Sequence, residues 1–358
     1  MCNLHPGSLI AGLRGALGRP LRLNPVGEPG NARTVTARRR FFGDDAVDPE
    51  TGAVRADRAV LSWVGCTTYA LALGGSVFLL DAWVPRVTSS GYVPATPQEL
   101  ADLRPAAIFI GHGHFDHAGD AGAIAEASGA TVYGTAEHCA AIRGQVLEPT
   151  FPTAALGDAH TPIGQRHEAT VAGVEVTAVR HLHSARTPED LADGASRFFP
   201  RPELSPILHH RPTLTDLRQT LPRLLDPEGG VLLYQFRVPG FTLTWHDSAG
   251  PLTEKAPEVF DVLAGLPATD VHIGAVQGYN QITNGLRDPR KYVEALRPSV
   301  FVPAHHDNWL PGLTASAATY DAPLRAELAR LTSGRRPELR TMHDPTDYLS
   351  PGRLTFAL

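Results

Sequence analysis

Six consecutive residues, His112-Gly113-His114-Phe115-Asp116-His117, constrain this chain more than any other feature of its sequence. Three imidazoles and one carboxylate so close together make physical sense if a cation lies among them. Imidazole nitrogen and carboxylate oxygen suit zinc, manganese and iron, and the spacing of His112 and His114 lets two rings reach one ion. Asp116 and His117 follow beyond a turn, where they can hold a second ion. The run therefore predicts a metal centre rather than a solvated polar loop.

Length and composition are those of a globular protein with a large core. The chain has 358 residues, of which 42% are hydrophobic and 19% charged, enough for one large α/β domain or two smaller ones. The net charge of -5 and the shortness of its basic runs exclude a nucleic-acid binder that relies on a basic surface. No segment approaches the roughly 20 apolar residues that span a bilayer. We expect no membrane span, a small-molecule substrate and, as an open possibility, a homo-oligomer.

The cysteines bear on the compartment. Cys2, Cys66 and Cys139 are an odd number without CxxC spacing, which fits neither a disulfide framework nor a cysteine-type structural zinc site. A reducing compartment is the simpler interpretation, so we expect a cytoplasmic protein.

Apolar runs between turns predict strands, and alanine-rich segments predict helices. The expected strands are 59–64, 69–73, 76–80, 106–110, 131–133, 174–179, 231–236, 241–245, 271–275 and 300–302. The expected helices are 119–128, 137–142, 257–263, 289–296 and 324–331. The histidine run thus lies in a loop between a strand and a helix, where a rigid scaffold commonly holds catalytic groups.

Changes in residue composition along the chain suggest the domain boundaries. Residues 1–55 are rich in Gly, Pro and Arg with weak periodicity, and we treat them as an N-terminal extension that wraps the domain or frays from it. The catalytic domain is expected over 56–340, with an insertion over the site at about 184–225, where Pro, Arg and His are frequent. Residues 341–358 form a C-terminal segment.

The histidine run resembles the HxHxDH signature of the metallo-β-lactamase superfamily, and the resemblance extends over roughly residues 58–310. It implies an α/β protein with an αββα sandwich, in which two mixed β-sheets pack together with helices outside. In that family further ligands follow at strand ends as a lone His, an Asp and a last His.

Three later segments supply candidates in this order. The strand Val176-Thr177-Ala178-Val179 leads to His183, which aligns with the lone His, with His181 as the alternative. Trp245-His246-Asp247-Ser248-Ala249-Gly250 resembles the family's Gly-Asp-Ser/Thr-Gly turn, with His246 in place of the usual Gly. Val302-Pro303-Ala304-His305 resembles the strand-Pro-x-His ending, which favours His305 over His306 as the last ligand.

The resemblance implies two divalent metal ions. His112, His114 and His183 would hold the first ion, and Asp116, His117 and His305 the second, while Asp247 bridges them. Zinc is expected, with Mn²⁺ or Fe²⁺ as alternatives. A hydroxide between the ions would be the nucleophile, so no Ser or Cys nucleophile is needed.

Other polar residues have supporting roles in this interpretation. Asp116 and Asp247 are the catalytic carboxylates, and Asp116 would also orient the attacking water or accept its proton. Asp81, at a strand end, would orient a ligand histidine from behind. His246, Tyr279 and His306 are candidate substrate-binding residues, although a plain turn fits Tyr279 equally well.

The sequence texture is most similar to the L-ascorbate-6-phosphate lactonase-like branch, which also contains phospholipid-cleaving phosphodiesterases. This implies a metal-dependent hydrolase of a lactone, ester or phosphodiester in a small molecule. Two alternatives stay open: an iron-dependent oxidoreductase on the same fold, and a non-catalytic metal-binding protein. The presence of all seven candidate ligands speaks against a degenerate site.

Overall fold

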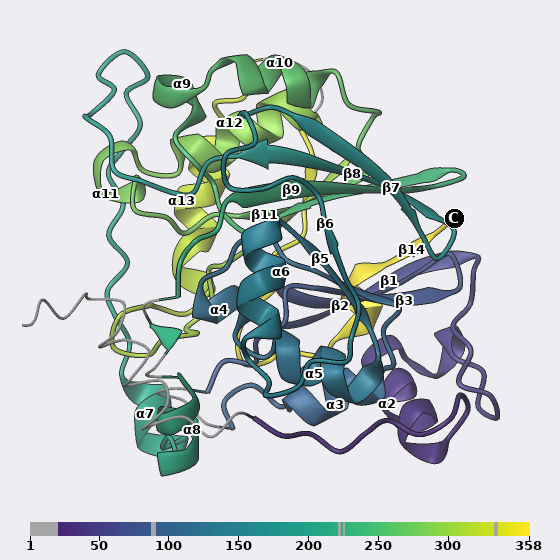
Figure 1. Cartoon of the computed structure of the whole chain (residues 1–358). Coiled ribbons are helices and arrows are strands. Elements are labelled where there is room, and N and C mark those ends of the chain that lie inside the picture. Colours follow the sequence, from purple (N-terminus) through teal and green to yellow (C-terminus); the bar gives the residue numbers. More distant parts are fainter. Residues whose placement is uncertain (1–20, 87–90, 221–222, 225, 333–335) are drawn as a thin grey trace, which may run out of the picture.

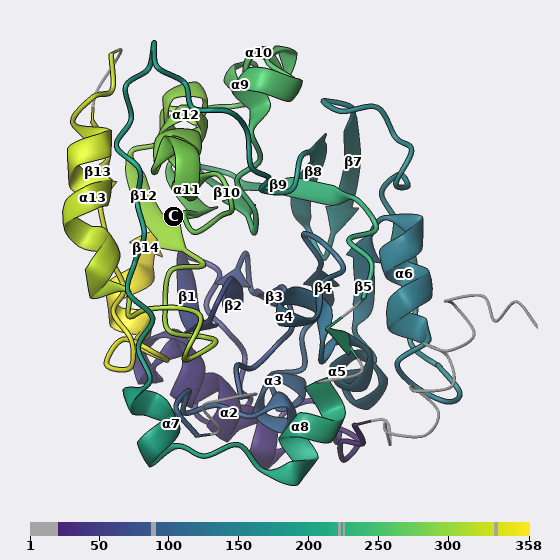
Figure 2. The ribbon, with the colours of Figure 1, turned by 90° about the vertical axis from the view of Figure 1, so that its left-hand side faces the viewer.

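Two layers of β-sheet form the centre of the molecule, with helices on the outside (Figures 1 and 2). The computed structural model describes residues 21–86, 91–220, 223–224, 226–332 and 336–358. In that part of the chain the strands form two sheets of seven. This is the αββα sandwich that the sequence predicts.

The strands of the first sheet are β1 (Arg58–Gly65), β2 (Thr68–Leu73), β3 (Ser76–Leu80), β4 (Ala107–Phe109), β5 (Thr131–Gly134), β6 (Thr153–Ala155) and β14 (Thr355–Ala357). Those of the second are β7 (Arg166–Val171), β8 (Val174–His181), β9 (Val231–Val238), β10 (Phe241–His246), β11 (Val271–Ala275), β12 (Val300–Ala304) and β13 (Glu338–Leu339). Each sequence-predicted strand is present, with ends displaced by a few residues at most.

The α-helices are α2 (Ala32–Phe42), α3 (Pro97–Asp102), α4 (Phe115–Ala118), α5 (Ala121–Ser128), α6 (Ala136–Arg143), α7 (Ser205–His209), α8 (Leu214–Thr220), α9 (Leu252–Lys255), α10 (Glu258–Ala264), α11 (Gln281–Asn284), α12 (Arg287–Leu296) and α13 (Ala318–Leu328). Short 3₁₀ turns lie at Asp44–Ala46 and Pro351–Leu354. Helices α2, α3 and α5 cover one sheet, and α10, α12 and α13 cover the other (Figures 1 and 2). None of the helices described has the length and apolar character needed to cross a membrane.

Strand direction decides where the polar strand ends gather. The first sheet runs in the order β14-β1-β2-β3-β4-β5-β6, antiparallel up to β3 and parallel beyond it. The second runs β13-β12-β11-β10-β9-β8-β7, antiparallel from β7 to β10 and parallel from there to β13. Strands β1, β3 and β4 therefore point one way within their sheet, as do β8, β10 and β12 in theirs, so each set brings its carboxyl ends to one edge.

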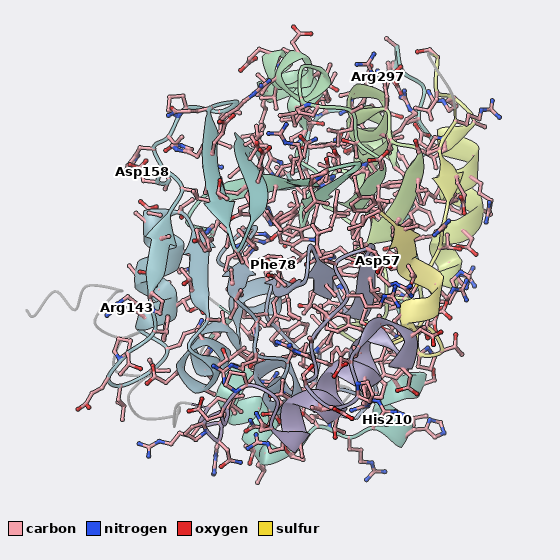
Figure 3. All side chains as sticks on the ribbon, turned by 90° about the vertical axis from the view of Figure 1, so that its right-hand side faces the viewer. Asp57, Phe78, Arg143, Asp158, His210 and Arg297 are labelled. Atoms are coloured by element: carbon pink, nitrogen blue, oxygen red, sulfur yellow. The ribbon has the colours of Figure 1, made fainter. Side chains whose placement is uncertain are left out.

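Aromatic side chains join the two sheets. Phe109 on β4 lies with its ring centroid 4.9 Å from that of Phe236 and 5.3 Å from that of Tyr234, both on β9. Phe78 on β3 is fully buried beside Phe109 and lies between the layers of strands in Figure 3. Since β2 is buried along its whole length, it shows a continuous apolar run instead of alternation.

Both ends of the described chain join the sandwich. Of the predicted N-terminal extension, residues 1–20 lie outside the described residues, whereas α2 packs on the first sheet with Phe41 and Phe42 buried. The C-terminal segment adds β14 to the edge of the same sheet, antiparallel to β1. The three consecutive arginines in α2 interrupt the helical spacing of its apolar residues, so the sequence pattern did not predict this helix.

The predicted insertion is fastened to the helical layer. Asp190 and Asp193 pair with Arg287 and Arg290 of α12 at 2.9 and 2.5 Å. Both arginines are almost completely buried. The described part of the insertion is thereby held next to the edge where the polar strand ends gather.

Candidate metal centre

Polar residues follow the carboxyl ends of strands from both sheets. In the first sheet these are Cys66 after β1, Asp81 after β3 and the histidine run after β4. In the second they are His183 after β8, Asp247 after β10 and His305 after β12. The two edges face each other, so side chains far apart in sequence meet in one centre.

The first cluster consists of His112, His114 and His183. One ring nitrogen of each lies within 4.8 Å of the others. His112 Nε2 and His114 Nδ1 are 3.0 Å apart, and the ring of His183 has its centroid 4.7 Å from that of His112. Three converging imidazole nitrogens suit a zinc ion with one position left open.

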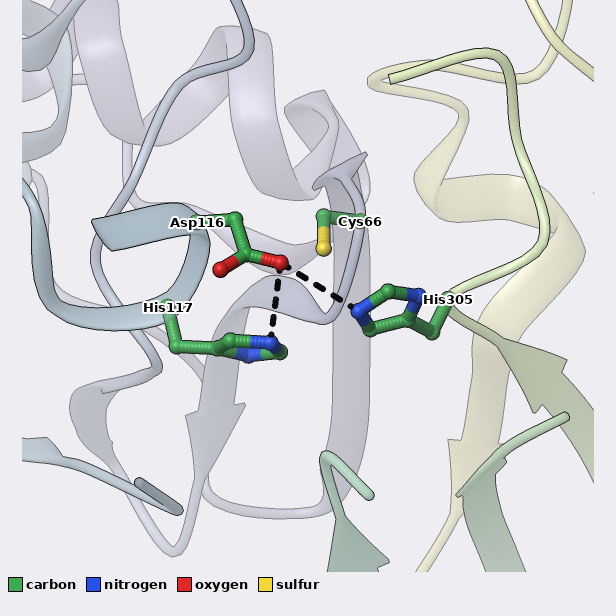
Figure 4. A group of neighbouring side chains, drawn as sticks. All are labelled: Cys66, Asp116, His117 and His305. Carbon is green, nitrogen blue, oxygen red and sulfur yellow. Dashed lines mark ion pairs between the residues drawn. The ribbon is translucent and has the colours of Figure 1, made fainter. Parts of the chain in front are cut away.

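The second cluster is formed by Asp116, His117 and His305, with Cys66 beside them (Figure 4). Asp116 Oδ2 lies 3.3 Å from His117 Nε2 and 3.4 Å from His305 Nε2. A tetrahedral ion with metal–ligand bonds of about 2.0–2.1 Å keeps its ligand atoms about 3.3–3.4 Å apart. Asp116 Oδ2 therefore already lies at the distance from both histidine nitrogens that such an ion requires.

Asp247 lies between the clusters. Its Oδ2 atom is 2.8 Å from His112 Nδ1 and 3.4 Å from His117 Nδ1. Its Oδ1 atom is buried and has no hydrogen-bond partner among the described residues. Buried carboxylate oxygens are almost always satisfied, and a cation would supply the missing partner. Gly111 permits this approach, because a Cβ there would lie 2.1 Å from Asp247 Cγ.

Neighbouring polar groups fix the orientation of two candidate ligand rings. Asp81 Oδ2 lies 2.8 Å from His117 Nδ1, and the Thr67 hydroxyl lies 2.6 Å from the same carboxylate oxygen. Gln277 Oε1 lies 3.3 Å from His305 Nδ1 and accepts a hydrogen bond from Trp309 Nε1 at 3.0 Å. Carboxylate–imidazole pairs of this kind hold a ligand ring in place and raise its basicity.

Burial and neighbouring charges shift the pKa values of the candidate ligands in different directions. Burial lowers the pKa of His112 well below its usual range and that of His183 to about 4, which favours the neutral form that binds metals. Burial alone would raise the pKa of Asp116, but His117 and His305 outweigh it and hold that pKa well below the usual range. Burial would lower the pKa of His117, yet Asp116, Asp81 and Asp247 raise it strongly. Such acidic surroundings stabilise a positive charge here.

Both clusters open into a cavity of about 510 Å³. Besides the seven predicted ligands it is lined by Phe115, Ser184, Leu224, Ser248, Gln277, Gly278, Tyr279, Gln281, Ile282, Trp309, Leu310, Leu313 and Thr314. Seven of these thirteen residues are aromatic or aliphatic, and the others are Ser, Gln, Gly and Thr. Among the residues that the structure describes, no lysine or arginine lines it.

The seven predicted ligands all line this cavity, and Tyr279 lies at its rim with 61% of its surface exposed. The two alternatives for the lone histidine separate clearly. His183 faces His112 and His114, whereas His181 is fully buried with Nδ1 2.8 Å from the Tyr292 hydroxyl.

His246 and His306 do not reach the cavity, so the expectation that they bind substrate is corrected. His246 packs between Tyr292 and His272, with ring centroids 4.6 and 5.0 Å away. His306 stacks on Trp63 at 5.7 Å. Successive side chains of an extended segment point to opposite sides. His246 is the last residue of β10, so it faces the core because Asp247 faces the centre. His305 has a left-handed φ of 55°, and His306 after it faces the core beside Trp63.

Sequence reasoning missed three residues that touch the centre: Cys66, Thr67 and Gln277. Cys66 and Thr67 are the first two residues after β1, and the predicted ligands Asp247 and His305 are likewise the first residues after β10 and β12. That placement was a usable signal. Gln277 lies two residues beyond β11 and carried no comparable mark.

Comparison with known proteins relates the chain to a described family. Residues 61–224 match the family model of the Metallo-beta-lactamase superfamily. A UPF0173 metal-dependent hydrolase of Pyrobaculum neutrophilum is 40% identical over 77 residues, which are 22% of this chain and 32% of that protein. One from Pyrobaculum arsenaticum is 33% identical over 132 residues, 35% of this chain and 51% of that protein. The chain thus spans about a third to a half of the length of these curated relatives.

A solved structure shares the fold. Igni18, described as a novel metallo hydrolase from Ignicoccus hospitalis, superimposes with a TM-score of 0.52 and 16% sequence identity over 84% of this chain and 99% of that chain. At this identity the likeness shows the sandwich alone. The segment 61–224, which contains the histidine run, is thus similar in sequence to the metallo-β-lactamase superfamily.

Proposed function

We propose that this chain is a metal-dependent hydrolase that holds two divalent ions, preferably zinc, and cleaves a carboxylic ester or lactone of a small molecule. The carrying observation is that seven imidazole and carboxylate side chains from the ends of four strands line one cavity. The relatives described as metal-dependent hydrolases support the reaction class.

The side chains divide the work by position. His112, His114 and His183 would hold one ion, Asp116, His117 and His305 the other, and Asp247 would contact both. When bound, the ions polarise a substrate oxygen and lower the pKa of a water molecule toward neutrality. Asp116, which is ionised, would orient that water or take up its proton at a carboxylate oxygen. Tyr279 at the rim would contact the substrate.

The cavity wall favours an ester or lactone over a phosphodiester. Phosphate recognition usually relies on Arg or Lys side chains. The described lining has neither, and its wall includes Phe115, Trp309 and Leu313. A substrate with an uncharged carbonyl and an apolar portion is therefore the better match to this surface.

The test is a hydrolysis screen of the zinc-loaded protein with p-nitrophenyl esters, γ- and δ-lactones and bis-p-nitrophenyl phosphate. We expect hydrolysis of esters or lactones that chelation abolishes and added zinc restores. His114→Ala should lower kcat/KM at least about 100-fold, since even partners behind the ligands contribute about 10- to 100-fold. His160→Ala, at an exposed position, is the matched control. Protein that holds two ions yet leaves every ester and lactone intact would contradict the proposal.

A further inference from the structure

The second cluster has a fourth donor that the metal-centre assignment so far leaves unused. We propose that the thiol of Cys66 is a ligand of the second ion, so that this ion is held by Asp116, His117, His305 and a sulfur atom. This inference rests on the metal centre of the proposed function and goes beyond it by assigning a further ligand and a metal preference.

The geometry carries the assignment. Cys66 Sγ and the donor atoms of Asp116, His117 and His305 all lie within 4.8 Å of one another (Figure 4). Asp116 is 3.3 and 3.4 Å from the two histidine nitrogens, which are tetrahedral edges for bonds of about 2.0–2.1 Å. Sulfur, whose bonds to zinc are longer at about 2.3 Å, would occupy the fourth corner of such a set.

The backbone holds Cys66 in this position. Its amide donates to the carboxylate of Asp307 at 3.0 and 3.1 Å, and its carbonyl accepts from His305 N at 3.1 Å and Trp63 Nε1 at 3.2 Å. Cys66 has a φ of 50° and His305 a φ of 55°, a left-handed conformation that side chains other than glycine rarely adopt. Such strain persists where the surroundings enforce it, commonly at ligand sites. Here it directs the two side chains at one point.

An independent observation, an unpartnered buried carboxylate oxygen, favours a cation in this centre. Asp247 Oδ1 is completely buried and lacks a hydrogen-bond partner among the described residues. Cys66 itself is fully buried, close to the carboxylates of Asp81, Asp116 and Asp307. A positive ion among these groups would satisfy the orphan oxygen and draw the sulfur into coordination. On binding, the S–H bond breaks, its proton passes to solvent and a sulfur lone pair forms the bond to the ion, with no change in oxidation state.

The assignment makes the two ions unequal. The first ion has three imidazole ligands and keeps an open position, as catalytic zinc sites do. The second has four protein donors, one of them sulfur. Thiolate favours zinc over manganese or magnesium, which prefer oxygen ligands. We therefore expect the second site to select zinc and the first site to receive the substrate oxygen.

Cobalt substitution tests the sulfur ligand directly. With two Co²⁺ ions per chain, the wild-type protein should show an intense near-ultraviolet band from sulfur-to-cobalt charge transfer. Cys66→Ser and Cys66→Ala should lack the band, and Cys139→Ser should keep it as the matched buried control. Absence of the band in the loaded wild-type protein, or its persistence in Cys66→Ala, would overturn the assignment.

A second measurement needs no variant. X-ray absorption at the zinc edge of the zinc-loaded wild-type protein should show a sulfur neighbour at about 2.3 Å besides the nitrogen and oxygen shell at about 2.0–2.1 Å. A spectrum without the sulfur neighbour would contradict coordination. The failure of one proposal can be distinguished from the failure of the other. Hydrolysis without the cobalt band would contradict only the sulfur ligand. The band without hydrolysis would contradict only the proposed activity.

Discussion

Oδ2 of Asp247 lies 2.8 Å from Nδ1 of His112. The two residues are 135 positions apart in sequence, and each is almost completely buried. If His112 binds the first ion through Nε2, its Nδ1–H donates to this carboxylate, while Oδ1 of Asp247 remains available to the ions. One carboxylate thereby orients a ligand and can serve as a ligand itself.

Asp247→Asn tests this double role. We expect the variant to lose about one of two ions and to lose at least about 100-fold in kcat/KM, because an amide is a poorer metal ligand and can present a donor to His112. Metal content by mass spectrometry after gel filtration checks the first effect, and ester hydrolysis the second. Asp45→Asn, at an exposed position, serves as control. Full retention of both ions would show that Asp247 is not needed to hold them.

Gly111→Ala should damage the centre without touching a ligand. The added Cβ would lie 2.1 Å from Asp247 Cγ and Oδ2, so the carboxylate must move. We expect loss of metal together with a destabilisation of about 1–3 kcal/mol, the usual range for overpacking. Gly352→Ala is the matched control, since its Cβ would meet nothing within 4 Å. Thermal unfolding and metal content measure both effects, and equal behaviour of the two variants would refute the steric argument.

Stability of the metal-free protein should fall on acidification. Burial lowers the pKa of His306 to about 3 and that of His246 to about 4, from a usual 6.5. Below pH 6.5 the unfolded chain takes up protons that these buried rings do not. The contribution of these neutral rings to the free energy of unfolding is therefore fully present above that pH. It is lost as the pH falls toward 4 for His246 and toward 3 for His306. Each ring contributes a slope of about 1.4 kcal/mol per pH unit.

Urea unfolding at a series of pH values between neutral and mildly acidic checks this slope. His306→Gln should reduce it by about 1.4 kcal/mol per pH unit, whatever its effect on absolute stability. His160→Gln, at an exposed position, should leave it unchanged. An unaltered slope in His306→Gln would mean that this ring is not the source.

The apolar wall should determine acyl-chain preference. If the acyl portion lies along Leu313, kcat/KM should rise from acetate to butyrate to hexanoate esters, by up to about fourfold per methylene. Leu313→Ala should flatten that rise, whereas Leu191→Ala should not, since Leu191 is 82% exposed and does not line the cavity. Steady-state kinetics over the ester series distinguish the cases. A preference for short chains in the wild-type protein would exclude this binding mode.

Short-range patterns in the sequence are sufficient to predict the sandwich and the candidate ligands of the histidine run. Strands such as 76–80 and 300–302 are nearly continuous apolar runs, and this pattern predicts strands that are buried on both faces. The histidine run is local, with spacing fixed by the backbone, and the later candidate ligands lie at strand ends that parallel strands bring to one edge. Local patterns of this kind need no knowledge of distant contacts.

The other features of the site depend on contacts between residues far apart in sequence. His181 and His183 differ by two residues, and the side toward which the chain turns after β8 gives His183 to the centre. His246 faces the core because Asp247 faces the centre. Period-two alternation places the two side chains on opposite sides but does not say which side is the core. Cys66 receives its anchor from Asp307, 241 positions away, and no local pattern encodes so distant a contact. Residues so far apart in sequence come together only through the packing of the two sheets. The interactions of neighbouring residues do not determine that packing.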